Sequence, residues 1–564
     1  MSLRFLRKVF MSISIILLGF FFTTFSGSIL AYLSVATMMG PWMAPTIALI
    51  TNICFKFKQR IFRSSPSTDQ HATALIQAIG SVGGAVATGI GFAFPMLYFL
   101  DRPTFNILLA TPGLFCLFIA GLCVTAGSLG IVLGTLFAHE FIDKEQLSFP
   151  VSQLTYNVIC AQNNRVQALG IFKGVTSTIL FSLIRDGIGK IGGIIPKTIH
   201  LFTPYFNQEC AIALWPTIWA IGFSSGLGLV APILLGLLSK YLILFPLNNH
   251  AAYLPVAFFQ PMNIASFTVA FCSGIVLCEL VFGLIKHAHL GLKKLNFHTF
   301  VCFWNKITQL FTFHSRQTST QITHWSWTLL LLIGVLSSII SFLSWFKFSF
   351  LAQITFLAFC TFATHQICLI GGKIGLIQYG RFSTYILIPM FLLFDLTYLQ
   401  LTIVCVFFNI CAATASDTLF DLQTGTLANI SRKKMWFVQW IGLLGVALSL
   451  GTIFYFLLTN LHLGSPDFFA QRSQAKALLL QTLHFDPFVV FFGFLYGFII
   501  KKSGLSPTMV FGGIIMPNSI SIGLIIGASL TLLTHNKEDY LPFCAGVFAS
   551  ESLWILTSIF IKML

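Results

Sequence analysis

Charged side chains are scarce in this sequence. Only 9% of its 564 residues are Asp, Glu, Lys or Arg, whereas a soluble globular domain carries about 25%. Apolar residues make up 56% of the chain. This composition excludes an ordinary soluble protein and leaves no polar stretch large enough for a soluble domain. We therefore expect a polytopic membrane protein in contact with the lipid bilayer.

Acidic residues are scarcer still, with 16 Asp and Glu against 32 Lys and Arg. In a soluble protein a net charge of +16 would suggest a nucleic-acid partner. Here the cations gather in short loops between apolar runs, as they do in the cytoplasmic loops of membrane proteins. We predict no nucleic-acid partner, and we expect both the N-terminus and the C-terminus in the cytoplasm.

Several catalytic and metal-binding motifs are missing. The 13 cysteines form no CxxC pair and lie mostly in apolar runs, which is typical of small buried hydrophobic residues. There is no GxxxxGK[ST] loop for nucleotide phosphates, no DxD pair for a metal-bound sugar nucleotide, and no HExxH zinc motif. We therefore predict no enzyme activity, no cofactor and no metal site, and any uphill transport should be driven by ions.

The apolar runs predict an all-α fold. At about 20 residues per span, the sequence has room for about 14–16 spans, some of them broken or re-entrant. The longest polar stretch, residues 286–325, is basic and contains irregularly spaced histidines. It separates an N-terminal transmembrane half, residues 1–285, from a C-terminal transmembrane half, residues 326–564. We expect the two halves to be structurally related and the stretch between them to be cytoplasmic.

Glycine and proline interrupt several of the apolar runs, at residues 38–45, 80–95, 148–152 and 511–519. Discontinuous helices in corresponding parts of two halves point to a substrate site near the middle of the membrane. Small residues spaced four apart, such as Gly130 and Gly134, also let helix backbones approach closely. Pro150 indicates the start of a helix, and we expect Pro232 to break the apolar run near residues 212–240. The residues that we predict to line a substrate cavity are Gly80, Ser81, Gly83, Gly84, Gly89, Phe149, Pro150 and Gly425.

Two acids stand out in the stretch 414–434. Asp417 and Asp421 lie between apolar runs and are four residues apart, so a helix would place them on one face. An acid inside a membrane is a candidate functional residue, because burying it without a partner is costly. The alternative is that both acids cap a helix or pair with the cations Arg432 to Lys434. Gly425 offers a stop for that helix.

Three further ionisable residues lie in apolar surroundings. A carboxyl group that gains and loses a proton as its cavity opens to each side could couple transport to protons, although each such group could instead be satisfied by a neighbouring helix. The candidates for proton coupling or gating, in addition to Asp417 and Asp421, are Glu551, Glu279 and His365.

Four stretches together resemble the oligopeptide transporter (OPT) family, which includes the yellow stripe-like metal-chelate carriers. Residues 74–95 are similar to the glycine-rich segment after the family's first loop, and residues 127–160 to its glycine-rich span leading into an LxFP element. Residues 416–429 (SDTLFDLQTGTLAN) are similar to its DxxxDLKTGxLLG motif, with Gln423 in place of the usual lysine. Residues 540–556 are similar to its closing GESL segment.

This resemblance to a bacterial-type member implies a symporter that imports short oligopeptides or peptide-like metal chelates with protons. It also implies location in a plasma membrane, which in bacteria is the inner membrane. The expected partners are the small peptide substrate and protons, and a homo-oligomer is left open. The alternatives are a membrane-embedded enzyme that acts on lipid-linked substrates, and a channel or scramblase.

Overall fold

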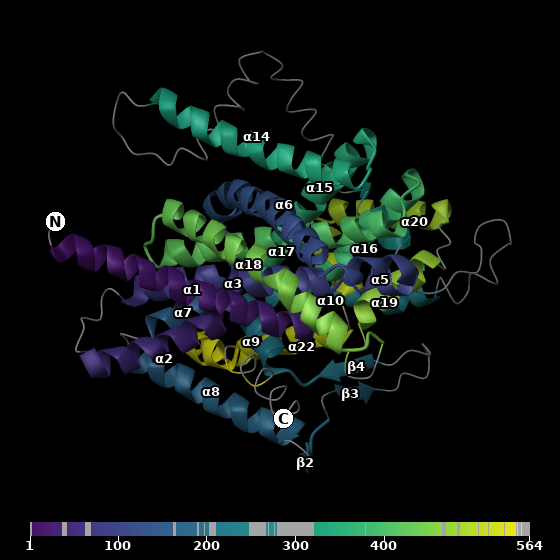
Figure 1. The fold of residues 1–564 in the computed structure, drawn as a ribbon. Coiled ribbons are helices and arrows are strands. Elements are labelled where there is room, and N and C mark those ends of the chain that lie inside the picture. The colour runs from purple at the N-terminus through teal and green to yellow at the C-terminus, as the bar shows by residue number, and fades with distance from the viewer. Residues whose placement is uncertain are drawn as a thin grey trace.

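The structure is a computed structural model and consists mainly of helices (Figure 1). It describes residues 3–36, 42–62, 69–161, 165–246, 267–282 and 321–554, with the gaps 189–190, 197, 202–209, 269, 276, 279–281, 378, 465–467, 469, 482–485, 506, 517, 535, 549 and 551–553. The central stretch 286–325 lies almost wholly outside these residues.

The helices follow the apolar runs of the sequence. Before the central stretch they are α1 (Leu3–Ala36), α2 (Ala44–Phe62), α3 (Asp69–Gly91), α4 (Met96–Leu100), α5 (Arg102–Ala110), α6 (Pro112–Ala138), the π-helix η2 (His139–Lys144), α7 (Pro150–Cys160), α8 (Arg165–Asp186), α9 (Pro216–Ser225), α10 (Leu227–Ser239) and the π-helix η3 (Lys240–Leu244). After it they are α14 (Gln321–Trp345), α15 (Phe350–Ile374), α16 (Tyr379–Leu393), α17 (Tyr398–Leu427), α18 (Arg432–Asn460), α19 (Gln471–Gln481), α20 (Pro487–Lys502), α21 (Pro507–Ile515), α22 (Asn518–Ser529) and the 3-10 helices η4 (Leu530–Leu533) and η5 (Glu538–Tyr540).

The chain is a multi-pass membrane protein. Among the described residues, six helices are long and apolar enough to cross a membrane, or seven if α9 and α10 form one bent span. This is fewer than the 14–16 spans expected from the sequence. Several apolar runs that look continuous in the sequence form helices of 10–17 residues, which are shorter than a full span.

The helix α17 lies at the centre of the bundle, and nearly all of its side chains are buried. It packs against α3, α6, α15, α16 and α18, so helices from both sides of the central stretch interleave (Figure 1). Glycine makes the closest of these contacts possible. A Cβ atom on Gly134 of α6 would lie 2.5 Å from the carbonyl oxygen of Ala415 on α17, which only a residue without a side chain allows.

The α17 helix ends two residues later than its glycine suggests. Gly425 lies inside the helix, so its prediction as the helix stop is wrong. The stop is made by Asn429, which adopts a left-handed φ of 55°. The amide of Asn429 bonds to the Thr426 carbonyl at 3.2 Å and that of Ile430 to the Gly425 carbonyl at 2.8 Å, the two hydrogen bonds of a Schellman motif.

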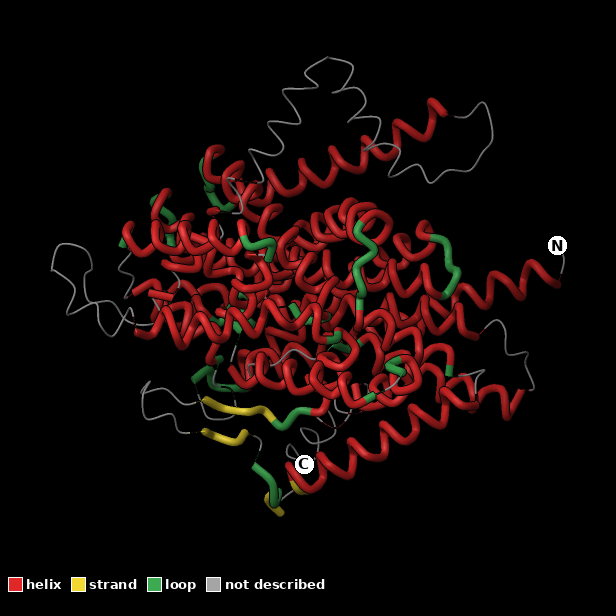
Figure 2. The backbone as a smooth tube through the Cα atoms, turned by 180° about the vertical axis from the view of Figure 1, so that it is seen from behind, coloured by secondary structure: helices red, strands yellow, loops and turns green. Residues whose placement is uncertain are grey.

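The fold is mainly helical, in agreement with the predicted all-α class, but it also contains a few short strands that the sequence did not predict. Two antiparallel pairs of short strands follow α8 at one edge of the molecule (Figure 2). The strands are β1 (Gly187–Ile188) paired with β2 (Ile191–Gly192), and β3 (Thr198–Leu201) paired with β4 (Cys210–Ala213). Strands this short give too few alternating residues to be recognised in an apolar sequence.

Most of the expected helix interruptions occur. The chain turns at residues 92–95 between α3 and α4, and α7 begins at Pro150 as predicted. Between α9 and α10 the axis bends by 119°. We expected Pro232 to break this segment, but it lies within α10, and the bend is at Gly226, whose φ of 82° favours glycine.

Candidate functional site

The two aspartates predicted from the sequence lie together on α17. Asp417 and Asp421 are each only 1% exposed. Asp421 is six residues before the end of the helix, or about 9 Å along its axis. The hydroxyl oxygen of Ser81, on α3, lies 2.9 Å from Asp417 Oδ2 and 3.2 Å from Asp421 Oδ2. The predicted shared face is therefore confirmed, and one serine bridges both carboxyl groups.

Two glutamines complete the site around Asp421. Gln77, one turn before Ser81 on α3, donates from Nε2 to Asp421 Oδ1 at 2.7 Å. Gln439, on α18, donates from Nε2 to Asp421 Oδ2. Both glutamines are fully buried, and neither Oε1 atom has a hydrogen-bond partner within the described part of the chain. Three side chains from two helices, α3 and α18, thus contact the carboxyl group of Asp421. Among the described residues, Asp417 is contacted only by the Ser81 hydroxyl.

The alternative that these acids cap a helix or pair with Arg432 to Lys434 is wrong. Both lie within α17 and not at its ends. The guanidinium group of Arg432 binds Asp143 of η2 instead, with Nη1 2.9 Å from Oδ2. In the described part of the chain, neither Asp417 nor Asp421 has an ion pair.

Two of the helix interruptions, at residues 38–45 and 148–152, meet beside the aspartates at Phe420. The ring of Trp42, just before α2, contacts the Phe420 ring edge-on with centroids 4.9 Å apart, and the Phe149 ring does so at 5.8 Å. Ser152 of α7 donates to the Phe420 carbonyl at 2.8 Å. The predicted LSFP element, with its buried Phe149 and Pro150, therefore packs directly against the helix that carries the acids.

Phe149 has an unusual backbone conformation. Its φ of 41° and ψ of 61° are left-handed, which is rare for a bulky residue and costs free energy. The surrounding structure holds it there: its amide donates to the Gly372 carbonyl at 2.8 Å, and its side chain is fully buried. Strain of this kind is common beside functional sites.

The predicted glycines lie at helix contacts. A Cβ atom on Gly83 would lie 2.0 Å from the carbonyl oxygen of Thr23 on α1, and one on Gly80 or Gly84 would meet side chains of α1 and the α2 region. Gly89 lies against the backbone of α17. These glycines allow α3 to approach its neighbours closely, and their role in a substrate cavity stays a prediction.

The other predicted ionisable residues are not part of this cluster. His365, on α15, has Nε2 3.3 Å from Glu140 Oε2 of η2, and both side chains are partly exposed. The same end of the molecule holds the pair of Asp143 and Arg432. Glu279 and Glu551 lie outside the described residues.

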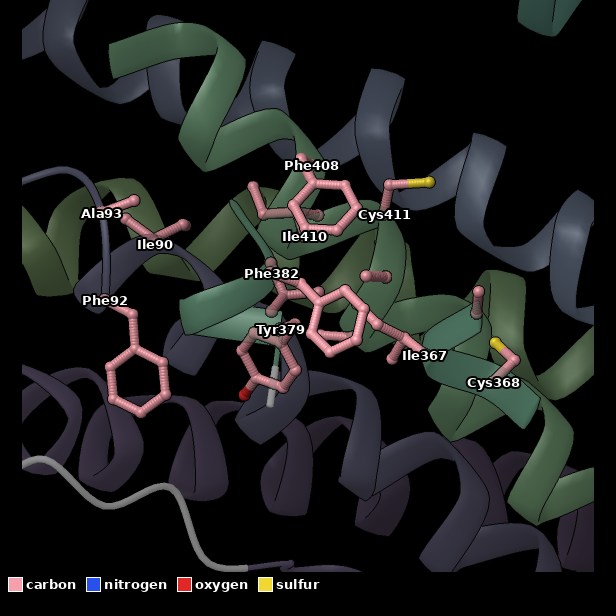
Figure 3. Close-up of a cluster of buried hydrophobic side chains, with 14 of the residues drawn as sticks. Ile90, Phe92, Ala93, Ile367, Cys368, Tyr379, Phe382, Phe408, Ile410 and Cys411 are labelled. Carbon is pink, nitrogen blue, oxygen red and sulfur yellow. The ribbon is translucent and has the colours of Figure 1, made fainter. Parts of the chain in front are cut away.

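A second buried polar centre was not predicted. Lys476, on α19, is 3% exposed and donates to the Phe92 carbonyl at 3.0 Å, in the turn that follows α3. Burial lowers the pKa of Lys476 to about 8. The guanidinium carbon of Arg472 lies 3.9 Å from the centre of the Phe92 ring. Figure 3 shows Phe92 beside Tyr379 of α16, their ring centroids 5.8 Å apart, and Tyr379 is hydrogen-bonded to Thr88.

No family model matches the chain, and no curated protein matches it significantly. Within the described residues there is no group of three His, Cys, Asp or Glu residues that could hold a metal ion. Any function of the site must therefore be inferred from the geometry of its residues.

Proposed function

We propose that this membrane protein is a secondary transporter that couples solute import to protons through Asp417 and Asp421. The proposed cargo is a short oligopeptide or a peptide-like metal chelate. The coupling is supported by the geometry of the buried acids. The cargo is supported by the resemblance of four sequence stretches to the oligopeptide transporter family.

The observation that carries the proposal is the Ser81 bridge. A serine hydroxyl has one hydrogen to donate and two lone pairs to accept with. Its oxygen lies within 3.2 Å of one oxygen from each aspartate, with a weaker third contact of 3.4 Å to the carbonyl of Ala78. Both aspartate contacts are hydrogen bonds at the same time only if one carboxyl group carries a proton and donates it to Ser81.

The surroundings favour the same proton count. Two ionised carboxylates one helix turn apart repel each other, and burying a charge without a paired cation costs several kcal/mol. The amides of Gln77 and Gln439 stabilise one negative charge, on Asp421. A second negative charge, on Asp417, would have only the hydroxyl of Ser81 as a hydrogen-bond donor to stabilise it. The closed site therefore holds one proton between the two acids.

The neighbouring helix interruptions supply a means of opening this site. Phe420, next to Asp421, is held by Trp42 and by Phe149, whose strained backbone stores free energy that a second conformation can release. Movement of these segments away from Phe420 admits water to the carboxyl pair. The pair then loses its proton to the side that opens, and the solute moves in the same cycle.

The test is uptake into proteoliposomes with and without an imposed inward proton gradient. The substrates are a mixture of tripeptides and, in a separate arm, a ferric peptide chelate. We expect gradient-dependent accumulation of one of them by the unchanged protein. Asp417→Asn and Asp421→Asn should abolish accumulation but retain exchange of labelled for unlabelled substrate. Asp143→Asn, which removes an acid outside the site, should retain both.

Three outcomes would overturn the proposal. Accumulation that does not depend on the gradient removes the proton coupling. Full coupled accumulation by both asparagine variants removes the assignment to Asp417 and Asp421. Rapid loss of preloaded substrate without any dependence on pH identifies a channel or scramblase instead.

A further inference from the structure

A cavity of about 490 Å³ lies between α8, α9, η4 and the residues around 540–547. The residues that line it do not include the aspartate pair or its hydrogen-bond partners. Its walls are formed mainly by apolar and aromatic side chains, among them Phe181, Phe223, Leu530 and Phe543. The volume falls within the range of about 300–1,000 Å³ typical of small-molecule sites. A cavity this large with apolar walls favours an apolar occupant over water.

Of the polar side chains that line the cavity, two have a buried polar atom without a hydrogen-bond partner within the described part of the chain. Trp219, on α9, and Thr178, on α8, both line the cavity. The Nε1 atom of Trp219 and the Oγ1 atom of Thr178 are buried and have no hydrogen-bond partner within the described part of the chain. A buried donor without an acceptor costs about 1–3 kcal/mol. An occupant with an oxygen acceptor would remove this cost, because the indole N–H can only donate.

The charge of the lining limits the chemistry of that occupant. None of the side chains that line the cavity is charged. The nearby cation Lys537 directs its Nζ atom to the carbonyl of Ser224. An anionic head group inside the cavity would therefore be buried without a counter-charge, whereas a neutral carbonyl would not.

The outer surface beside the cavity indicates where the occupant comes from. On α8, Leu169, Phe172 and Leu180 are each more than half exposed, and on the cavity rim Leu533 is 82% exposed. Large apolar side chains are exposed in this way where a membrane protein faces lipid. The cavity thus lies next to an exposed apolar surface, which gives an acyl chain a route into it.

We propose that this cavity binds an acyl chain of a membrane glycerolipid, with the neutral ester carbonyl accepting a hydrogen bond from Trp219 Nε1. The site is separate from the aspartate pair and does not depend on the transport proposal. Thr178 supplies a second hydrogen-bonding group, and the Phe181 ring, 6.4 Å from the Trp219 ring between centroids, forms part of the same wall.

The experiment uses the full chain in nanodiscs that contain a phosphatidylcholine with a photoactivatable group in one acyl chain. Mass spectrometry of the digested protein then locates the cross-links. We expect labelling of cavity residues on α8 and α9. Ala220→Phe, which fills the cavity, should reduce this labelling at least fivefold. The control Leu169→Phe, on the lipid-facing side of α8, should leave it unchanged.

Competition measures the role of the carbonyl. Unlabelled ester-linked lipid should displace the probe about five- to tenfold better than its ether-linked analogue, which corresponds to one hydrogen bond. Trp219→Phe should remove this preference while retaining labelling. Thr178→Val adds no volume and should retain the folded protein if Ala220→Phe does not. Labelling confined to the outer surface, equal displacement by both lipids, or stronger displacement by a free fatty acid would each overturn the proposal.

Discussion

The unequal hydrogen bonding of the two aspartates predicts unequal costs when each is replaced by leucine. Asp421→Leu removes the acceptor of two buried amides, Gln77 Nε2 and Gln439 Nε2. Asp417→Leu removes only one contact of Ser81, whose hydroxyl can still donate to Asp421. Both variants remove one carboxyl group, so their difference reports mainly on the two amides.

The expected difference follows from the number of groups left without a partner. A buried polar group that loses its partner costs about 1–3 kcal/mol. Two such amides make Asp421→Leu less stable than Asp417→Leu by about 2–6 kcal/mol. Asp421→Asn should cost much less, because either glutamine can turn its amide so that the unpartnered Oε1 accepts from the new NH₂ group.

The assay is unfolding in mixed micelles by increasing SDS, followed by tryptophan fluorescence. A second set of variants checks the cause. Replacing Gln77 and Gln439 by leucine in the Asp421→Leu background removes both orphaned donors and should recover most of the lost stability, because apolar replacement of both partners is close to neutral. Equal destabilisation by Asp417→Leu and Asp421→Leu, or no recovery in the triple variant, would refute the reasoning.

Three further predictions use the same unfolding assay. The pKa of Lys476 is about 8 in the folded protein, below its ordinary 10.5, because burial disfavours the charge. The unfolded chain therefore binds more protons between those pH values, so the free energy of unfolding should rise from pH 8 to 10.5. Lys476→Met should flatten this rise. Equal slopes of unfolding free energy against pH in the variant and the unchanged protein would contradict the prediction. Phe149→Gly should be about 1 kcal/mol more stable than Phe149→Ala, because the left-handed backbone strains any residue with a Cβ; the reverse order would exclude the strain. Gly134→Val should lower the free energy of unfolding by about 1–3 kcal/mol or more, because its Cβ would lie 2.5 Å from Ala415 O. The control is Gly113→Val on the same helix, whose Cβ would have no atom within 4 Å, and it should cost less.

The candidate site could be predicted from the sequence only in part. Two acids four residues apart in an apolar run were enough to predict that Asp417 and Asp421 share a face. Ser81 was predicted as a cavity residue, but the two glutamine partners were missed. The signal was present, because Gln77 and Gln439 are polar residues within apolar helices, just as the acids are. Which of them meets Asp421 depends on how α3 and α18 pack on α17, and a single sequence does not specify these long-range contacts.

The same limit applies to the fold. The helix start at Pro150 and the close approach at Gly134 depend on local backbone chemistry, and both were predicted correctly. The bend at Gly226 was assigned to Pro232 instead, because proline is tolerated inside a helix when neighbouring groups replace its missing hydrogen bond. The short strands after α8 depend on tertiary context and were missed. The stop of α17 was also missed, because the left-handed residue that makes it is Asn429 and not the nearby Gly425.

The central position of α17 has a consequence for the biogenesis of the protein. Its two acids are costly to place in lipid without hydrogen-bond donors. The helix α3, which carries the donors Gln77 and Ser81, is translated before α17. The third donor, Gln439, follows on α18. A nascent chain that retains α3 near the insertion machinery therefore has hydrogen-bond donors ready for the acids as they emerge. Losing Gln77 and Ser81 should impair membrane integration of α17 more than losing Gln439.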